Sequence, residues 1–191
     1  MVFDNPKWNF RSFNFDSDVK LTDSRLGPVL NSTNPDLEPF KARGGKLIQY
    51  HGWADAAIAP MSSIDYYERV LAVARRKTGG NALKETQSFY RLFMAPGMEH
   101  CGGGPGANVF GNAFGTPPKE DDAQHDVVKA LERWVEQGVA PEKIIATKYV
   151  DDKPAKGVAR TRPLCPYPEE AQWTGKGSTN DAANFVCRLG Q

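Results

Sequence analysis

The sequence predicts an α/β fold with a mostly parallel sheet flanked by helices. Short apolar runs have the character of buried strands, longer segments carry apolar residues at helical spacing, and the two kinds alternate between residues 44 and 150. Strands joined through helices usually pair in parallel, with the helices on the faces of the sheet. Functional loops in such sheets lie beyond the carboxyl ends of the strands.

The first strand is expected at residues 46–51, a short apolar run that ends at a glycine. A helix is expected from about Ser62 to Lys77, with Ser62 or Ser63 as its N-cap and Gly79 as its stop. Its apolar face would comprise Ile64, Tyr67, Val70, Leu71 and Ala74.

The second half of the pattern begins with a strand at residues 89–94. Residues 102–118 are rich in Gly, Pro and Asn and predict an irregular loop suited to an active site. A helix is expected from Asp121 or Asp122 to Gly138, followed by a strand at 144–150. The apolar face of this helix would comprise Val127, Val128, Leu131, Trp134 and Val135.

The two ends of the chain differ from this pattern. Residues 1–43 are aromatic but aperiodic and predict an irregular segment, separate from the unit at 44–191. The chain has three cysteines, an odd number. Cys165 and Cys187 could close a loop across a polar tail, leaving Cys101 over, or all three could be free in a reducing compartment.

Charge and hydropathy exclude some classes of partner. The formal net charge is +1, with no long basic stretch, which argues against nucleic acid or an anionic membrane as the main partner. No apolar run is long enough to cross a bilayer. Met1 is followed by neither a basic segment nor an apolar one, so any export signal is expected outside this sequence.

Asp55 and His100 each follow a predicted strand, where an acyl-transfer enzyme carries the carboxylate and the imidazole of its catalytic triad. No serine lies in a setting that would complete such a site. The ordinary alternatives are a turn residue for Asp55 and a surface histidine for His100. Cys101 is a weak candidate for an internal nucleophile, because side chains of adjacent residues in an extended segment point to opposite sides.

The remaining candidates are less specific. His51 ends a strand and His125 lies near a helix start, so both are interpreted as structural. Ile58 and Trp53 lie near Asp55 and could line an aromatic pocket, with core packing as the alternative. No metal site is expected, because neither C-x-x-C nor H-x-x-x-H spacing occurs.

Several ordered motifs resemble the C-terminal part of the tannase and feruloyl esterase family. Members of that family are α/β-hydrolases that cleave esters of aromatic hydroxy acids through a Ser, Asp, His triad. The resemblance covers most of the chain. The motifs are DNPKWNFRSFNFDSDV, GGKLIQYHGWADAAI, FYRLFMAPGMEHCGGG, DVVKALERWVEQGVAPEKI, RTRPLCPYP and STNDAANFVC.

The resemblance implies a role for several residues. Asp55 would be the triad acid and His100 the base. Cys101 would pair with a cysteine just before the nucleophilic serine, outside this sequence, and Cys165 and Cys187 would form a second disulfide. The chain would be the C-terminal portion of a secreted or periplasmic esterase that acts on a small aromatic ester.

The sequence departs from the family in one respect, because it contains no G-x-S-x-G element and no Gly-Cys-Ser segment. We therefore expect the serine to come from a missing N-terminal half, together with the family's calcium-binding lid. No cofactor is expected in this chain itself. A non-catalytic remnant or binding module with a hydrolase-like architecture is the alternative.

Overall fold

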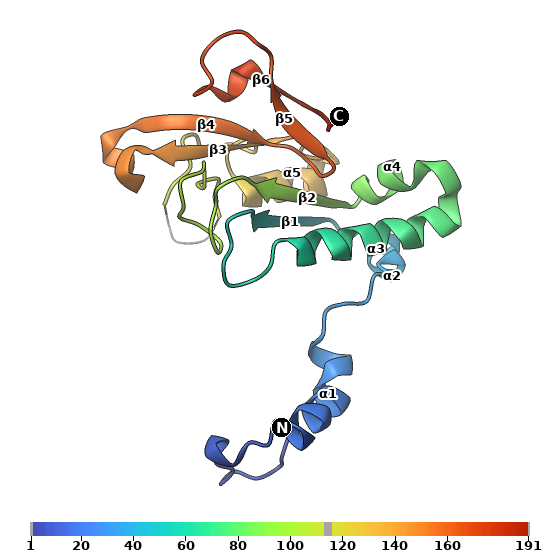
Figure 1. Cartoon of the computed structure of the whole chain (residues 1–191). Coiled ribbons are helices and arrows are strands. Elements are labelled where there is room, and N and C mark those ends of the chain that lie inside the picture. The colour runs from blue at the N-terminus through green and yellow to red at the C-terminus, as the bar shows by residue number, and fades with distance from the viewer. Residues whose placement is uncertain (1, 113–115, 191) are drawn as a thin grey trace. The chain divides into compact units, whose positions relative to one another are not determined.

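The structure is a computed structural model that describes residues 2–112 and 116–190 (Figure 1). It divides into two compact units, Met1–Pro35 and Asp36–Gln191. The short helix α2 (Glu38–Ala42) belongs to the larger unit.

The smaller unit contains a helix where the sequence predicts irregular structure. The 3-10 turn η1 (Phe10–Ser12) precedes α1 (Ser17–Leu30), and no residue of either element is buried. A helix that buries no face shows no apolar period in its sequence, which is why the prediction for residues 1–43 is wrong here. The aromatic residues instead stack locally, as Phe3 does on Trp8 with ring centroids 4.6 Å apart.

The larger unit is built around two parallel strands, β1 (Leu47–Gly52) and β2 (Tyr90–Ala95). They are joined by α3 (Met61–Thr78), η2 (Gly79–Asn81) and α4 (Ala82–Gln87), so this part forms the expected strand, helix, strand unit. Figure 1 shows α3 running alongside the strand pair. Four of the five residues on the predicted apolar face are buried, namely Ile64, Tyr67, Val70 and Leu71.

Strand β2 separates two hydrophobic clusters, because alternate side chains of a strand point to opposite faces. Leu92 and Met94 pack with the residues of α3, whereas Phe93 and Ala95 pack in the other cluster. The second cluster also contains Met98 and residues from α5 (Val127–Gln137), β3 (Ile144–Tyr149) and β4 (Val158–Leu164). Burial on both faces holds β2 and the loop after it in a fixed place.

The prediction of a mostly parallel sheet is confirmed only for β1 and β2. Strand β3 pairs with β4 in antiparallel register, from Ile144 opposite Leu164. The two strands are joined by the short turns η3 (Val150–Asp152) and η4 (Pro154–Lys156), a connection too short for a parallel crossover. The charged residues Arg160 and Arg162 within β4 hide its strand character in the sequence.

Helix α5 begins later than the sequence predicts. Asp126 is its N-cap and accepts hydrogen bonds from the backbone N–H groups of Val128 and Lys129. Asp122, one of the expected starting residues, instead closes a turn through the backbone N–H groups of Gln124 and His125. The buried residues of α5 are Val127, Ala130 and Trp134, whereas Val128 and Val135 of the expected face are exposed.

The C-terminal tail is closed by a disulfide between Cys165 and Cys187, as expected, with Cα atoms 5.6 Å apart. Within it, β5 (Glu169–Trp173) and β6 (Phe185–Leu189) pair in antiparallel register, with η5 (Ala182–Asn184) before β6. Among the described residues, every helix is too short or too polar to cross a membrane.

Candidate active site

The loops after β1 and β2 lie against each other, because parallel strands end at the same edge of a sheet. The backbone N–H of Ala54 donates to the carbonyl of Met98 at 2.9 Å, and that of Trp53 to the carbonyl of Ala95 at 3.0 Å. Gly52 makes this approach possible, because a Cβ at this position would lie 2.1 Å from the Met98 carbonyl oxygen. The two loops carry Asp55 and His100.

Asp55 and His100 are hydrogen-bonded, although 45 positions separate them in the sequence. Nδ1 of His100 lies 2.8 Å from Oδ2 of Asp55. The Asp55 side chain is only 3% exposed, whereas that of His100 is 56% exposed. This contact uses Nδ1, so Nε2 on the opposite side of the imidazole is the nitrogen available for proton transfer.

Oδ1 of Asp55 is held separately by the turn that follows it. The backbone N–H groups of Ala57 and Ile58 donate to this oxygen at 2.8 and 2.9 Å. The N–H of Ile58, followed by the contact with His100 and the N–H of Ala57, holds the pKa of Asp55 well below its usual range, although burial opposes the shift. Asp55 is therefore a carboxylate that orients an imidazole.

A second histidine contacts the same carboxylate. Nε2 of His51 lies 3.1 Å from Oδ2 of Asp55, and Nδ1 lies 2.7 Å from Oγ of Ser63. The sequence interpretation treats His51 as structural and does not find this contact. The signal in the sequence is the spacing of His51 and Asp55, four residues apart across the end of a strand.

Ser63 is not a helix cap, since α3 begins at Met61 and both Ser62 and Ser63 lie within its first turn. Consecutive hydrogen bonds connect Ser63 to His51 and His51 to Asp55, as in a catalytic triad. Ser63 is nevertheless unsuited to act as a nucleophile. It is buried, its Oγ accepts a hydrogen bond from Gln49 at 2.8 Å, and it is not among the residues that line the adjacent pocket.

That pocket has a volume of about 120 Å³, and its lining includes Asp55, His100 and apolar side chains. Ile58 lines it, as the sequence suggests, whereas Trp53 lies half-exposed outside it. Cys101 also lines the pocket; it is free and has a left-handed backbone with φ of 59°. The full lining is Tyr50, His51, Gly52, Asp55, Ile58, Met98, His100 and Cys101.

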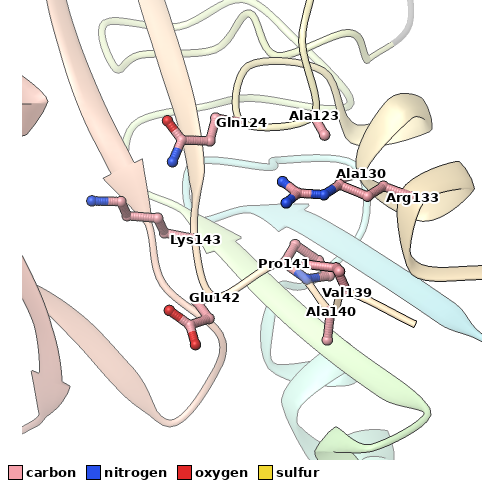
Figure 2. Close-up of a pocket in the computed structure, with 9 residues that line it drawn as sticks. All are labelled: Ala123, Gln124, Ala130, Arg133, Val139, Ala140, Pro141, Glu142 and Lys143. Carbon is pink, nitrogen blue, oxygen red and sulfur yellow. The ribbon is translucent and has the colours of Figure 1, made fainter. Parts of the chain in front are cut away.

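A second pocket of about 330 Å³ lies beside α5 and the segment that follows it (Figure 2). Its charged groups are those of Arg133, Glu142 and Lys143; Figure 2 shows Arg133 extending from α5 and the other two from the segment before β3. The nine lining residues include no histidine, serine or cysteine, so this pocket lacks the groups needed for acyl transfer.

Glu120, Asp122 and His125 form a cluster whose ligand atoms lie within 4.8 Å of one another. The cluster does not fit the calcium ion that the family resemblance implies for its lid. Calcium prefers oxygen ligands, whereas Nδ1 of His125 lies 2.8 Å from Oδ1 of Asp122 and Lys119 pairs with Glu120 at 3.3 Å. His125 is buried and is not among the residues that line the pocket with Asp55 and His100.

Comparison with known proteins identifies the family of this chain. The family model for tannase and feruloyl esterase matches residues 1–188. The chain belongs to the tannase and feruloyl esterase family. It is 48% identical over 203 residues to an uncharacterized esterase of Xanthomonas campestris pv. campestris, covering 98% of the chain and 35% of that relative.

Two further members of the tannase and feruloyl esterase family are informative. The mono(2-hydroxyethyl) terephthalate hydrolase of Piscinibacter sakaiensis is 42% identical over 157 residues, which are 82% of this chain and 22% of that protein. The crystal structure of feruloyl esterase B from Aspergillus oryzae matches with a TM-score of 0.76 and 32% identity, covering 98% of this chain and 35% of that one. The chain thus spans about a third or less of the length of these relatives.

Proposed function

We propose that the chain supplies the acid and base of a serine carboxylic ester hydrolase that acts on esters of aromatic hydroxy acids. The hydrogen bond between Asp55 Oδ2 and His100 Nδ1 carries the proposal, because it joins a buried carboxylate to a partly exposed imidazole that lines the pocket. Membership of a family of esterases supports the reaction class. The nucleophilic serine would come from polypeptide outside this sequence.

In the proposed mechanism, His100 takes the proton of the serine hydroxyl through Nε2 while the serine oxygen attacks the ester carbonyl. Asp55 keeps the proton of the imidazole on Nδ1 and stabilises the imidazolium that forms. His100 then protonates the leaving alcohol. Water repeats the attack on the acyl-enzyme, which releases the aromatic acid and returns the proton to the serine.

The substrate class rests on the pocket and on the relatives. Ile58 provides an apolar wall close to Asp55 and His100, suited to an aromatic acyl group. Trp53, which lies outside the pocket lining, would contact substrate only from the rim. The names of relatives include feruloyl esterases and a terephthalate monoester hydrolase.

Further features of the complete enzyme are part of the same proposal. Cys101 lies at the pocket and would form a disulfide with a cysteine beside the nucleophilic serine. A calcium ion would be held by a lid outside this sequence. The disulfide between Cys165 and Cys187 supports a secreted or periplasmic location, where disulfides persist.

The test compares this chain with the same chain joined to its upstream coding sequence. We expect an in-frame Gly-Cys-Ser segment upstream, hydrolysis of methyl ferulate or methyl gallate by the longer protein, and none by the chain alone. His100→Ala should abolish that hydrolysis. Turnover by the chain alone that requires His100 would contradict the assignment of the nucleophile, and an upstream sequence without such a serine would contradict the proposed mechanism.

A further inference from the structure

We propose that His51 is a positioning residue for the triad acid: its Nε2–H holds the Asp55 carboxylate in the orientation that aligns His100. The inference rests on the proposed function, which gives Asp55 and His100 their roles. It adds a second imidazole, also in the pocket lining, that acts on the reaction by fixing the group that orients the base.

The position of Nε2 determines that this nitrogen is a donor. It lies 3.1 Å from Oδ2 of Asp55 and 3.2 Å from the backbone carbonyl oxygen of Ile58, and both of these atoms only accept hydrogen bonds. The ring proton of His51 therefore lies on Nε2. Its side chain is only 11% exposed, so little water competes for this proton.

A chain of side chains behind His51 selects the same tautomer. Tyr90 donates through its hydroxyl to Oε1 of Gln49, and the amide nitrogen of Gln49 donates to Oγ of Ser63 at 2.8 Å. The Ser63 hydroxyl is then left to donate to Nδ1 of His51, 2.7 Å away. Burial raises the pKa of Tyr90, so its hydroxyl keeps the proton that begins this chain.

Both oxygens of the Asp55 carboxylate are held by hydrogen bonds. Oδ2 accepts from His51 and His100, and Oδ1 accepts from the backbone N–H groups of Ala57 and Ile58. Without His51, Oδ2 would keep only the contact with the more exposed His100. Oδ2 could then move while Oδ1 stays anchored to the backbone, and the imidazole would lose its alignment.

The first experiment measures the tautomer of each ring directly. The chain has three histidines, so ¹⁵N-histidine NMR of this chain gives three assignable rings. We expect His51 to carry its proton on Nε2 and His100 to carry its proton on Nδ1. Ser63→Ala should remove the hydrogen bond to Nδ1 of His51 and shift the ¹⁵N resonance of that nitrogen, whereas the matched change Ser62→Ala, at an exposed neighbour in the same helical turn, should leave it unchanged.

A His51 ring with its proton on Nδ1, or an Nδ1 resonance that does not change in Ser63→Ala, would overturn the inference. This readout needs no esterase activity. If the complete enzyme proved inactive on esters, the proposed function would fail while the contact between His51 and Asp55 would still be tested.

The second experiment uses the chain joined to its upstream sequence, with an aromatic methyl ester as substrate. His51→Leu should lower kcat about ten- to a hundredfold, with KM changed less than about twofold, because a charge-assisted hydrogen bond to the acid is lost. His51→Gln places an amide N–H near the position of Nε2 and should restore most of kcat. His125→Gln is the matched control, because His125 also contacts a carboxylate but lies outside the pocket lining.

A His51→Leu variant with unchanged kcat would refute the positioning role. Equal losses in His51→Leu and His51→Gln would also refute it, because they would show that ring packing and not hydrogen-bond donation matters.

Discussion

Asp55 gives each carboxylate oxygen a different task. Oδ1 anchors the turn through the N–H groups of Ala57 and Ile58, and Oδ2 faces the imidazoles of His51 and His100. The residue thus joins the local backbone to the pocket. Asp55→Asn allows the effect of the charge on catalysis and the effect on stability to be measured separately.

Asp55→Asn in the complete enzyme should lower kcat about ten-thousandfold, because an amide favours the wrong tautomer of the base, as it does in other serine hydrolases. Steady-state kinetics on methyl ferulate measures the loss. Asp122→Asn is a matched control, since Asp122 also accepts from a histidine ring and two backbone N–H groups. Equal losses in both variants would contradict a catalytic role for Asp55.

The same residue predicts how stability changes in acid. Because the pKa of Asp55 is lowered in the folded chain, the unfolded chain binds a proton that the folded chain does not once the pH falls below about 4. The contribution of Asp55 is therefore complete near neutral pH and is lost as the pH falls toward its folded pKa. Urea unfolding of the parent and of Asp55→Asn between pH 7 and 3 should show their difference shrinking; a constant difference would contradict the prediction.

The sequence identifies Asp55 and His100 because each follows a strand, and parallel strands bring their following loops together. It does not identify the contact of His51 with Ser63. Those residues lie on different elements, and their approach depends on how the turn after β1 returns the chain to the start of α3. Ser63 resembles a helix cap until that geometry is known.

At the scale of elements, the close contact between the end of β1 and the loop after β2 places Asp55 beside His100. Gly52 is required there for space rather than for backbone conformation, since added atoms would meet the carbonyl oxygens of Met98 and Glu99. The contact lies two residues before the base. A change that disturbs this contact should displace His100 while the domain stays folded.

Gly52→Ala should destabilise the chain by about 1–3 kcal/mol and weaken the hydrogen bond between His100 and Asp55, because the loop must move to admit the methyl group. Thermal unfolding measures the first effect, and the His100 Nδ1–H resonance measures the second. Gly138→Ala is the control, with φ of +71° and nothing within 4 Å of the added atom. Gly138→Ala should lower stability by about 1 kcal/mol through backbone strain alone and leave the His100 Nδ1–H resonance unchanged. If both variants shifted this resonance equally, the role assigned to the contact at Gly52 would be wrong.

The elements that the sequence predicts well are those with a buried face. Helix α3 and strands β1 and β2 have clear apolar patterns because they pack in the two hydrophobic clusters. Helix α1 buries nothing, and β4 carries charged side chains, so neither has a pattern to detect. Strand β3 pairs with β4 because the connection between them is short. The pattern of alternating strands and helices in the sequence does not predict this antiparallel pair.

For the whole molecule, the described residues form two units, and the candidate site lies entirely within Asp36–Gln191. The disulfide that closes the tail belongs to the same unit, and its cysteines are 22 positions apart in the sequence. A cross-link over that span contributes roughly 3 kcal/mol by limiting the unfolded chain. The thiol of Cys101, in contrast, lies at the pocket.

Alkylation without reductant should modify Cys101 and spare Cys165 and Cys187, because only Cys101 is free among the described residues. Mass spectrometry of the digested chain locates the label. In the complete enzyme, the proposed disulfide between Cys101 and a cysteine beside the serine should protect Cys101 from alkylation as well. Labelling of Cys165 or Cys187 in the unreduced chain would be inconsistent with the structure.

The contact between Asp55 and His100 involves only the loops after β1 and β2, so a single polypeptide holds the proton-handling part of the site. An enzyme divided ahead of this polypeptide would keep that part assembled in one fragment. Activity would then return only when the fragment that carries the nucleophilic serine binds to this one. Such a division could serve as the basis of a split-esterase sensor.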